Sequence, residues 1–167
     1  MSMREKVRAF AGAFVFLLIA PGTVAGVVPW LISHWQFKAG HSRALAAAGI
    51  TFIVFGLIPL LESFSRFAWK GLGTPAPVAP TKHLVVSGFY QHVRNPMYLG
   101  VIAIIIGQAL LLADVDLLIY ALAAWLVMHA FVMSYEEPRL RRTFGARYAD
   151  FCAHVPRWLP RWRPWMG

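Results

Sequence analysis

Four long apolar segments constrain this chain more than any other feature of its sequence. They cover residues 9–32, 44–64, 97–113 and 117–135. A helix needs about 20 mostly apolar residues to cross the hydrocarbon core of a bilayer. The whole chain is 59% hydrophobic and has a mean hydropathy of +0.58, above the roughly 45–50% apolar share of soluble domains. The sequence therefore predicts an all-α integral membrane protein with about four transmembrane helices.

Prolines and one short polar tip divide these segments further. Pro21 and Gly22 interrupt the first segment, and Pro59 predicts a kink near the end of the second. Only the tripeptide Asp-Val-Asp at 114–116 is clearly polar between the last two segments. We therefore expect these two to form an antiparallel helical hairpin.

The basic residues predict an orientation in the membrane. Of the 16 Lys and Arg residues, three precede the first apolar segment, four lie between the second and third, and seven follow the fourth. Two lie in the first loop and none at the hairpin tip. The positive-inside rule then places both termini in the cytoplasm. The net charge of +9 fits contact with anionic headgroups, and we expect no nucleic-acid partner.

A cleaved signal peptide is an alternative interpretation of the N-terminal region, which has a basic start and an apolar centre. More apolar segments follow it rather than an exported domain, which favours a first transmembrane helix. We expect residues 1–167 to form one membrane domain, with a two-helix part (1–69) and a catalytic part (70–167). The single cysteine, Cys152, excludes an internal disulfide framework and a Cys-based zinc site, and we expect no metal site.

The stretch GFYQHVRNPMYLG places several polar groups directly before the third apolar segment. Asn95 is the expected N-cap and Pro96 the expected first residue of that helix. The helix N-terminus and Arg94 could together bind an anionic group. Tyr90 and Tyr98 could stack on a planar ring or lie against a cation. An aromatic belt with a basic anchor is the alternative.

A glycine- and proline-rich loop precedes this stretch. Gly71 and Gly73 allow a backbone to approach a ligand closely, and three following prolines stiffen the chain. The loop could cradle a cofactor, or it could simply link two helices. Glu62, at the end of the second segment, could line a polar cavity.

The end of the fourth apolar segment carries a second group of polar residues. His129 and Glu136 are seven residues apart, so a regular helix would place them on one face. Glu136 and Glu137 at the membrane edge need solvent or ionic partners. Three nearby arginines could form a surface ion cluster with them: Arg139, Arg141 and Arg142.

The C-terminal region predicts contact with the membrane surface. Pro138 predicts a break in the chain, followed by an amphipathic helix over residues 138–153 that lies in the interface plane. The tail PRWLPRWRPWMG interleaves tryptophan, arginine and proline. This composition favours an interfacial anchor over an active site.

Two of these motifs resemble a known family. LVVSGFYQHVRNPMYLG resembles the G-x-Y-x-x-V-R-[HN]-P-x-Y-x-G signature of the isoprenylcysteine carboxyl methyltransferases and phospholipid N-methyltransferases. YEEPRLRRTFGARYADFCAHVPRWLP resembles the closing pattern of the same family. The similarity covers about residues 71–160. It implies S-adenosylmethionine as methyl donor, bound on the cytoplasmic side.

The resemblance also implies a set of site residues. The expected cofactor-binding residues are Gly71, Gly73, Tyr90, Arg94, Asn95, Pro96, Tyr98, Gly100, Glu136 and Glu137. Arg94 would hold the carboxylate of the cofactor, and Glu137 or His129 would act as general base for an amine acceptor. Many carboxyl methyltransferases carry histidine at the position of Asn95, so His92 or His129 could substitute for it.

The expected function is methylation of a lipophilic acceptor within the membrane, with O-methylation of a carboxylate first and N-methylation of a phospholipid amine as the alternative. A nicotinamide-dependent reductase similar to sterol reductases is a further alternative, although those chains have many more spans. A non-catalytic membrane protein is another. The expected partners are membrane lipids and a lipophilic or amphipathic small-molecule acceptor.

Overall fold

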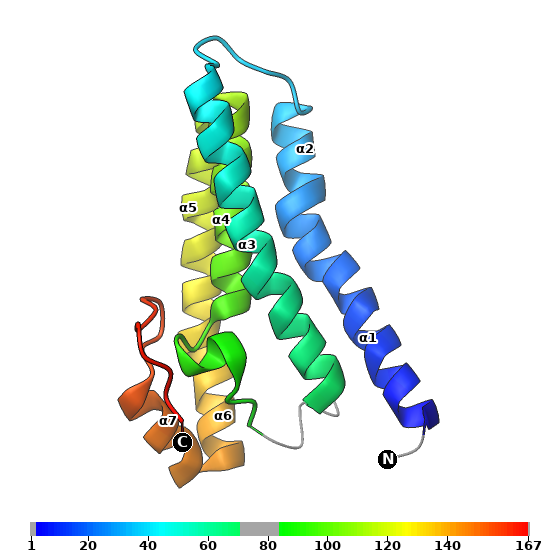
Figure 1. Ribbon diagram of the computed structural model, residues 1–167, viewed down its shortest axis with the longest axis vertical. Helices are drawn as coiled ribbons and strands as arrows, with labels where there is room; N and C mark the ends of the chain where they lie inside the picture. The colour runs from blue at the N-terminus through cyan, green and yellow to red at the C-terminus, as the bar shows by residue number, and fades with distance from the viewer. Residues whose placement is uncertain (1–2, 71–83, 167) are drawn as a thin grey trace.

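The computed structural model describes residues 3–70 and 84–166 of the chain. Within these ranges it contains helices and no strand, which confirms the all-α prediction. The long helices form an elongated bundle (Figure 1). The start of α1, the two short helices α6 and α7, and the C-terminal tail all lie at the same end of this bundle (Figure 1).

Three helical stretches are long and apolar enough to cross a bilayer: Phe14–Ser33, Arg43–Arg66 and Val115–Phe144. The chain is thus a multi-pass membrane protein. α4 (Pro96–Leu112) is also apolar but has only 17 residues, a rise of about 25 Å. It packs against both α3 (Arg43–Lys70) and α5 (Val115–Phe131). A fourth span made by α4 stays a prediction, as does the cytoplasmic location of both termini.

The first apolar segment is a continuous helical rod despite its proline. α1 (Met3–Gly22) passes through a π-helical turn, Thr23–Val27, into α2 (Val28–Ser33). Pro21 lies inside α1, where its ring removes one backbone hydrogen bond. Pro29 follows the π turn in the first turn of α2, and the π turn changes the hydrogen-bonding pattern at this point without ending the helix.

Two side chains from other helices bind the backbone of this π turn. The Gln108 amide nitrogen donates to the carbonyl of Ala25 at 2.8 Å, and the Tyr120 hydroxyl donates to the carbonyl of Val24 at 2.8 Å. These bonds from α4 and α5 fix the upper half of the first rod to the bundle. Its lower half, α1, runs beside α3 (Figure 1), and Phe16 lies against Phe64 with a ring-centroid distance of 6.1 Å.

The hairpin expected between the last two apolar segments is confirmed. Ala113 follows the last residue of α4 and caps it in a left-handed conformation (φ 54°). Asp114 then caps α5 by accepting a hydrogen bond from the backbone N–H of Asp116 at 2.9 Å. Lys38 from the preceding loop forms ion pairs with Asp114 at 2.8 Å and with Asp116 at 2.9 Å. The polar tip is therefore tied to the loop between α2 and α3.

Four glycines bring the backbones of α3 and α4 into direct contact. A Cβ atom added to Gly56 would lie 2.6 Å from the carbonyl oxygen of Gly100, and one added to Gly49 would lie 2.6 Å from that of Gly107. Small residues allow such close approach of helices in a membrane. The two glycines of α3 are seven residues apart, and so are the two glycines of α4. Both contacts therefore involve the same face of each helix. Gly100, expected as a cofactor-binding residue, is thus a packing residue in this fold.

The break expected at Pro138 is present only as a change of helix type. α5 continues through a second π turn, Val132–Glu136, into α6 (Glu137–Phe144). Pro138 occupies the first turn of α6, directly after this π turn. The altered hydrogen-bonding pattern accommodates the proline, as in the first rod.

The chain breaks instead at Gly145. This residue has a φ of +53°, which favours glycine, and it separates α6 from α7 (Ala146–His154). The prediction of one amphipathic helix over 138–153 is therefore wrong. α7 folds back on the preceding chain. Tyr148 and Phe151 of α7 form a small buried core with Val155, the residue that directly follows this helix.

The glycine contacts predict a specific sensitivity to added methyl groups. Gly100→Ala should destabilise the protein by about 1–3 kcal/mol, because overpacking outweighs the better helix propensity of alanine. The apparent Tm of detergent-purified protein would measure this. Gly26→Ala is the matched control, because a Cβ atom there meets nothing within 4 Å, and it should not lower the Tm. A Gly100→Ala protein as stable as wild type would contradict the described packing.

Candidate functional site

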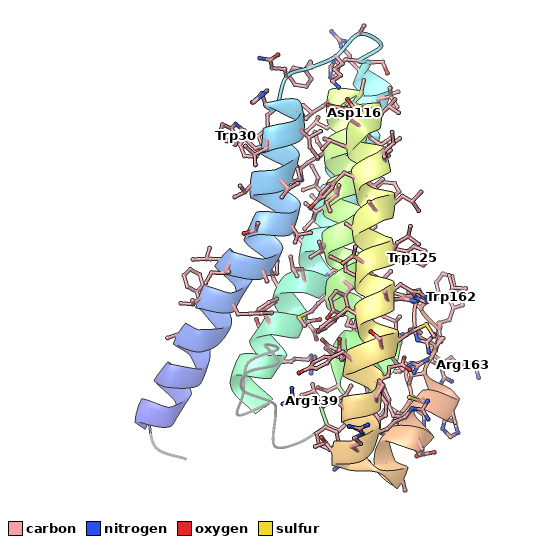
Figure 2. The ribbon with its side chains drawn as sticks, turned by 180° about the vertical axis from the view of Figure 1, so that it is seen from behind. Trp30, Asp116, Trp125, Arg139, Trp162 and Arg163 are labelled. Atoms are coloured by element: carbon pink, nitrogen blue, oxygen red, sulfur yellow. The ribbon has the colours of Figure 1, made fainter. Side chains whose placement is uncertain are left out.

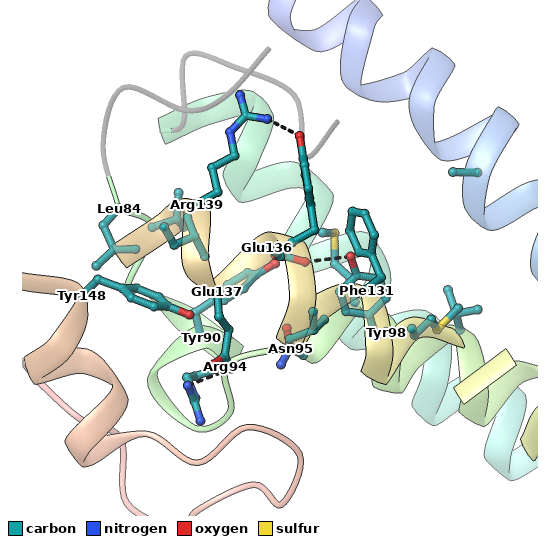
Figure 3. Close-up of a pocket in the computed structure, with 18 of the residues that line it drawn as sticks. Leu84, Tyr90, Arg94, Asn95, Tyr98, Phe131, Glu136, Glu137, Arg139 and Tyr148 are labelled. Atoms are coloured by element: carbon teal, nitrogen blue, oxygen red, sulfur yellow. Dashed lines mark hydrogen bonds and ion pairs between the residues drawn. The ribbon is translucent and has the colours of Figure 1, made fainter. Parts of the chain in front are cut away.

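A cavity of about 410 Å³ lies between α1, α4, α5 and α6. This volume is in the range typical of small-molecule sites, roughly 300–1,000 Å³. One part of its wall is apolar and includes Phe16, Ala20, Val24, Val101, Met128 and Phe131. The other part is polar and includes Tyr90, Arg94, Asn95, Tyr98, Glu136, Glu137, Arg139 and Tyr148 (Figure 3).

The segment before α4 turns sharply into the cavity wall. It forms a short 3₁₀ helix, Gly88–Gln91, whose first residue has a φ of +61°. Only glycine suits this position, because a Cβ atom would also collide with the side chains of Glu62 and Arg66. Those two residues form an ion pair with each other. Glu62, which we expected could line a polar cavity, lies behind this turn and is not among the lining residues.

The predicted start of α4 is confirmed, with Asn95 at the N-cap and Pro96 as its first residue. The Asn95 side chain makes no capping hydrogen bond. Its amide nitrogen donates instead to the carbonyl of Arg157 at 3.2 Å. Asn95 is buried and lines the cavity, while Pro96 is buried beneath it and does not.

The C-terminal tail runs along the segment that leads into α4. The backbone N–H of Arg94 donates to the carbonyl of Pro156 at 2.9 Å, and that of Arg161 donates to the carbonyl of His92 at 3.0 Å. Trp162 is 98% exposed and lies with Arg163 on the outer side of the bundle (Figure 2). The tail was expected only as an interfacial anchor, but its inner side is part of the site.

Glu137 is the centre of a buried ion-pair network. Its side chain is only 8% exposed, and its Oε1 atom lies 3.0 Å from Nη1 of Arg94. Arg157 binds the same carboxylate with two hydrogen bonds, Nε to Oε1 at 2.6 Å and Nη2 to Oε2 at 3.0 Å. These bonds raise the pKa of Arg157. Arg94 also donates to Sγ of Cys152 at 3.0 Å.

This network corrects one expectation from the sequence and bears on a second, which stays a prediction. Glu137 pairs with Arg94 and Arg157 rather than with the arginines that follow it on the same helix. Arg94, expected to hold the carboxylate of a cofactor, already binds a carboxylate of its own chain. Arg157 was not recognised as a site residue, because it is distant in sequence from both motif centres and reads as part of the basic tail.

Glu136 has a different environment from its neighbour. The Tyr98 hydroxyl donates a hydrogen bond to its Oε2 atom at 2.9 Å (Figure 3). Among the side chains that the structure describes, no Lys or Arg forms an ion pair with Glu136. The two adjacent glutamates therefore differ in role, because Glu137 is neutralised by arginines and Glu136 presents a carboxylate to the cavity.

Arg139 also lines the cavity, on the next turn of the helix. Its Nη1 atom donates to the Tyr135 hydroxyl at 2.6 Å, and its guanidinium carbon lies 5.8 Å from the centre of that ring. In the described part of the chain it pairs with no Asp or Glu side chain. The sequence suggested it only as a member of a surface ion cluster.

Two buried tyrosines complete the polar wall. Burial raises the pKa of the Tyr90 hydroxyl, and the negative charge of Glu136 raises it further. Burial likewise raises the pKa of Tyr148. Both phenols therefore remain protonated at physiological pH, and neither can serve as a general base in that state.

His129 is not brought to the cavity. Trp158 Nε1 donates to its Nδ1 atom at 3.0 Å, and its ring stacks on Trp125 with a centroid distance of 5.3 Å. The π turn between His129 and Glu136 explains why they do not share a face. One extra residue in a helix rotates everything after it by about 100°. Gly71 and Gly73 lie outside the described residues.

The protein is therefore an apolar multi-pass bundle that encloses a partly polar cavity. Residues 44–147 match the family model described as phospholipid methyltransferase, and the chain belongs to this family. The family resemblance seen in the two sequence motifs is thus confirmed.

Two curated proteins are similar to the chain. Protein-S-isoprenylcysteine O-methyltransferase B of Arabidopsis thaliana is 27% identical over 135 residues, which cover 79% of this chain and 64% of that protein. Protein-S-isoprenylcysteine O-methyltransferase of Rattus norvegicus is 31% identical over 123 residues, which cover 70% and 41%. The chain therefore spans less than two thirds of the length of these relatives. No solved structure matched it.

The Glu137 network predicts that the tail contributes to stability. Arg157→Ala should destabilise the protein by about 3 kcal/mol, because removing one partner leaves part of a buried carboxylate unpaired. Arg163→Ala, an exposed arginine of the same tail, should have no such effect. The apparent Tm in detergent would measure both variants. Equal Tm values for the two would show that the Arg157 contact does not hold the tail in place.

Proposed function

We propose that this protein transfers a methyl group from S-adenosylmethionine to a lipophilic acceptor within the membrane. The observation that carries this proposal is the Glu136 carboxylate, which faces the cavity of a phospholipid methyltransferase family member and forms no ion pair with any described side chain. S-adenosylmethionine would supply the methyl group, carried on a positively charged sulfonium. A half-buried carboxylate with no cationic partner among the described side chains suits such a ligand, which also carries an ammonium group.

The polar wall of the cavity fits the remaining parts of this cofactor. Tyr98 holds the Glu136 carboxylate in place through its hydroxyl and presents an aromatic ring beside it. Tyr90 and Asn95 add a second ring and an amide to the same wall. Methyl transfer is an in-line displacement, for which alignment of the reactants and exclusion of water are the main requirements. Buried side chains at fixed positions meet both.

The apolar part of the cavity suggests how the acceptor enters. Val127 and Phe131 line the cavity, yet they are 70% and 38% exposed on the surface of α5. A cavity wall that is also lipid-facing surface indicates a lateral opening between α1 and α5. A lipophilic acceptor would enter there from the bilayer, with its reactive group directed to the polar wall.

The geometry favours a carboxylate as the methylated group. An amine must lose a proton before it attacks, whereas a carboxylate needs no base. Of the two expected bases, Glu137 is bound by two arginines and His129 lies outside the cavity lining. O-methylation also agrees with the printed names of both curated relatives. N-methylation of a phospholipid amine is the second candidate, because the matched family model is described as phospholipid methyltransferase, and Glu136 would then be the base.

We place the site at the cytoplasmic side of the membrane. Residues of α6 and α7 line the cavity, and these helices lie with the tail at one end of the bundle (Figure 1). Seven of the 16 Lys and Arg residues follow residue 136 in this region. The positive-inside rule supports a cytoplasmic location for such a region, where a soluble cofactor would be available.

Methyl-labelled cofactor would test both the activity and the acceptor. Membranes that contain the wild-type protein should incorporate label into a lipid-soluble product. A methyl ester releases its label as methanol in mild alkali, whereas an N-methyl group keeps it. We expect alkali-labile label, and alkali-stable label would establish the amine alternative.

Glu136→Gln tests the role of the carboxylate charge. The variant keeps the size of the side chain and can still accept the hydrogen bond from Tyr98. It should reduce incorporation at least tenfold, because the charge is lost. It should not lower the apparent Tm. Absence of lipid-soluble label from wild-type membranes, together with no binding of S-adenosylhomocysteine at high micromolar concentration, would overturn the proposed function.

A further inference from the structure

We propose that Arg139 and Glu136 together bind an α-amino-acid group, with Arg139 on its carboxylate and Glu136 on its ammonium. The proposal rests on the proposed function, because S-adenosylmethionine carries such a group at one end. It assigns the carboxylate of the ligand to Arg139 and not to Arg94. Arg139 thereby becomes a binding residue that neither sequence motif indicated.

The positions of the two residues suit a ligand with two adjacent charges. Glu136 and Arg139 are three residues apart on the helix that runs from α5 into α6, and both line the same cavity. Side chains at this spacing are neighbours on a helix surface, with Cβ atoms about 5–6 Å apart. An α-amino-acid group carries its carboxylate and its ammonium on a single carbon atom. It could therefore contact both side chains at once.

Opposite charges at this spacing normally attract each other, but these two side chains form no ion pair. Each is held by a tyrosine instead: Tyr98 donates to Glu136 at 2.9 Å, and Arg139 donates to the Tyr135 hydroxyl at 2.6 Å. Figure 3 shows the Glu136 carboxylate turned toward Tyr98 and the Arg139 side chain extending away from it. The tyrosines thus keep the two charges apart. Each tyrosine hydroxyl is neutral, and it uses only one of the hydrogen-bonding positions of the charged group that it contacts.

Both side chains retain hydrogen-bonding capacity for a ligand. A carboxylate has a second oxygen, and a guanidinium has four N–H groups beyond the one that Tyr135 accepts. Of the other charged groups of the cavity wall, Glu137 is paired with both Arg94 and Arg157. Nη1 of Arg94 is bound to Glu137 and Cys152, and its Nε atom is buried without a partner among the described residues. Glu136 and Arg139 are therefore the charged groups of the cavity wall that form no ion pair with another described side chain.

This charge pattern separates an amino-acid group from other ligand chemistries. A lipid phosphate or a carboxylate acceptor would pair with Arg139 and leave Glu136 without a counter-ion. A lipid amine would pair with Glu136 and leave Arg139 unpaired. Charges that stay unpaired in a partly apolar cavity are unfavourable, so a zwitterion with neighbouring charges fits better than either.

Binding of matched cofactor analogues to the full-length protein in detergent tests this assignment. The ligands are S-adenosylhomocysteine, its analogue that lacks only the carboxylate, and its analogue that lacks only the amino group, each titrated by calorimetry. Loss of either group should weaken wild-type binding roughly tenfold to a hundredfold, the contribution expected for a charge-assisted hydrogen bond. Arg139→Gln should bind S-adenosylhomocysteine as weakly as wild type binds the decarboxylated analogue, and removal of the carboxylate should then cost nothing more.

Glu136→Gln should show the same behaviour toward the amino group, with full sensitivity to the carboxylate retained. The matched control is Arg142→Gln, an exposed arginine on α6 that does not line the cavity, and it should bind all three ligands like wild type. Arg94→Gln should keep full sensitivity to the carboxylate even if its stability is lower.

Three outcomes overturn the assignment. Wild-type binding that ignores the carboxylate does so directly, and so does loss of carboxylate sensitivity in Arg94→Gln but not in Arg139→Gln. If Arg139→Gln binds S-adenosylhomocysteine normally but requires a higher concentration of the acceptor, Arg139 serves the acceptor instead. These results leave the proposed function intact, whereas failure of the wild-type protein to bind S-adenosylhomocysteine removes both proposals.

Discussion

The carboxylate of Glu137 holds the candidate site together. It binds Arg94 from the segment before α4 and Arg157 from the tail, while its own backbone begins α6. Three segments that are far apart in the sequence therefore meet at one buried charge. A buried ion pair costs desolvation energy, and replacing it by apolar groups is often neutral or stabilising. Its value here is geometric, because it fixes the relative positions of the polar wall and the tail.

The neutralisation of Glu137 gives its neighbour a separate role. With Arg94 and Arg157 both committed, the remaining charges on the cavity wall are Glu136 and Arg139, each held by a tyrosine. One glutamate of the pair thus organises the protein, and the other is the one to which we assign the ligand. A substitution of either would lower activity, but through stability for Glu137 and through binding for Glu136. Measurements of activity alone would not distinguish these two causes.

Much of the fold follows from the sequence, because the length and apolar composition of a segment are enough to predict a membrane helix. The apolar segments, the hairpin at the Asp-Val-Asp tip, and the start of α4 at Asn95 and Pro96 were predicted from local signals that depend on nearby residues only. The glycine contacts between α3 and α4 were missed, although the seven-residue spacing of Gly49 and Gly56 matches that of Gly100 and Gly107. The pairing of Arg157 with Glu137 carries no local signal, since an arginine-rich tail next to a membrane is also what an anchor requires. The site is therefore less predictable than the fold: its motif residues were identified, but not their partners.

The two π turns account for the wrong predictions of helix breaks at prolines and of a shared helix face for His129 and Glu136. Both lie on helices that line the cavity, at Thr23–Val27 and Val132–Glu136, and each is next to a proline that suggests a helix break. A π turn keeps the helix continuous and shifts its later side chains by one position, so patterns counted along a regular helix fail across it. That shift separates His129 from the face of Glu136, whereas Glu136 and Arg139, at the end of the turn and after it, both line the cavity. The register of the helix, rather than the presence of the two glutamates alone, thus decides which charges face the cavity.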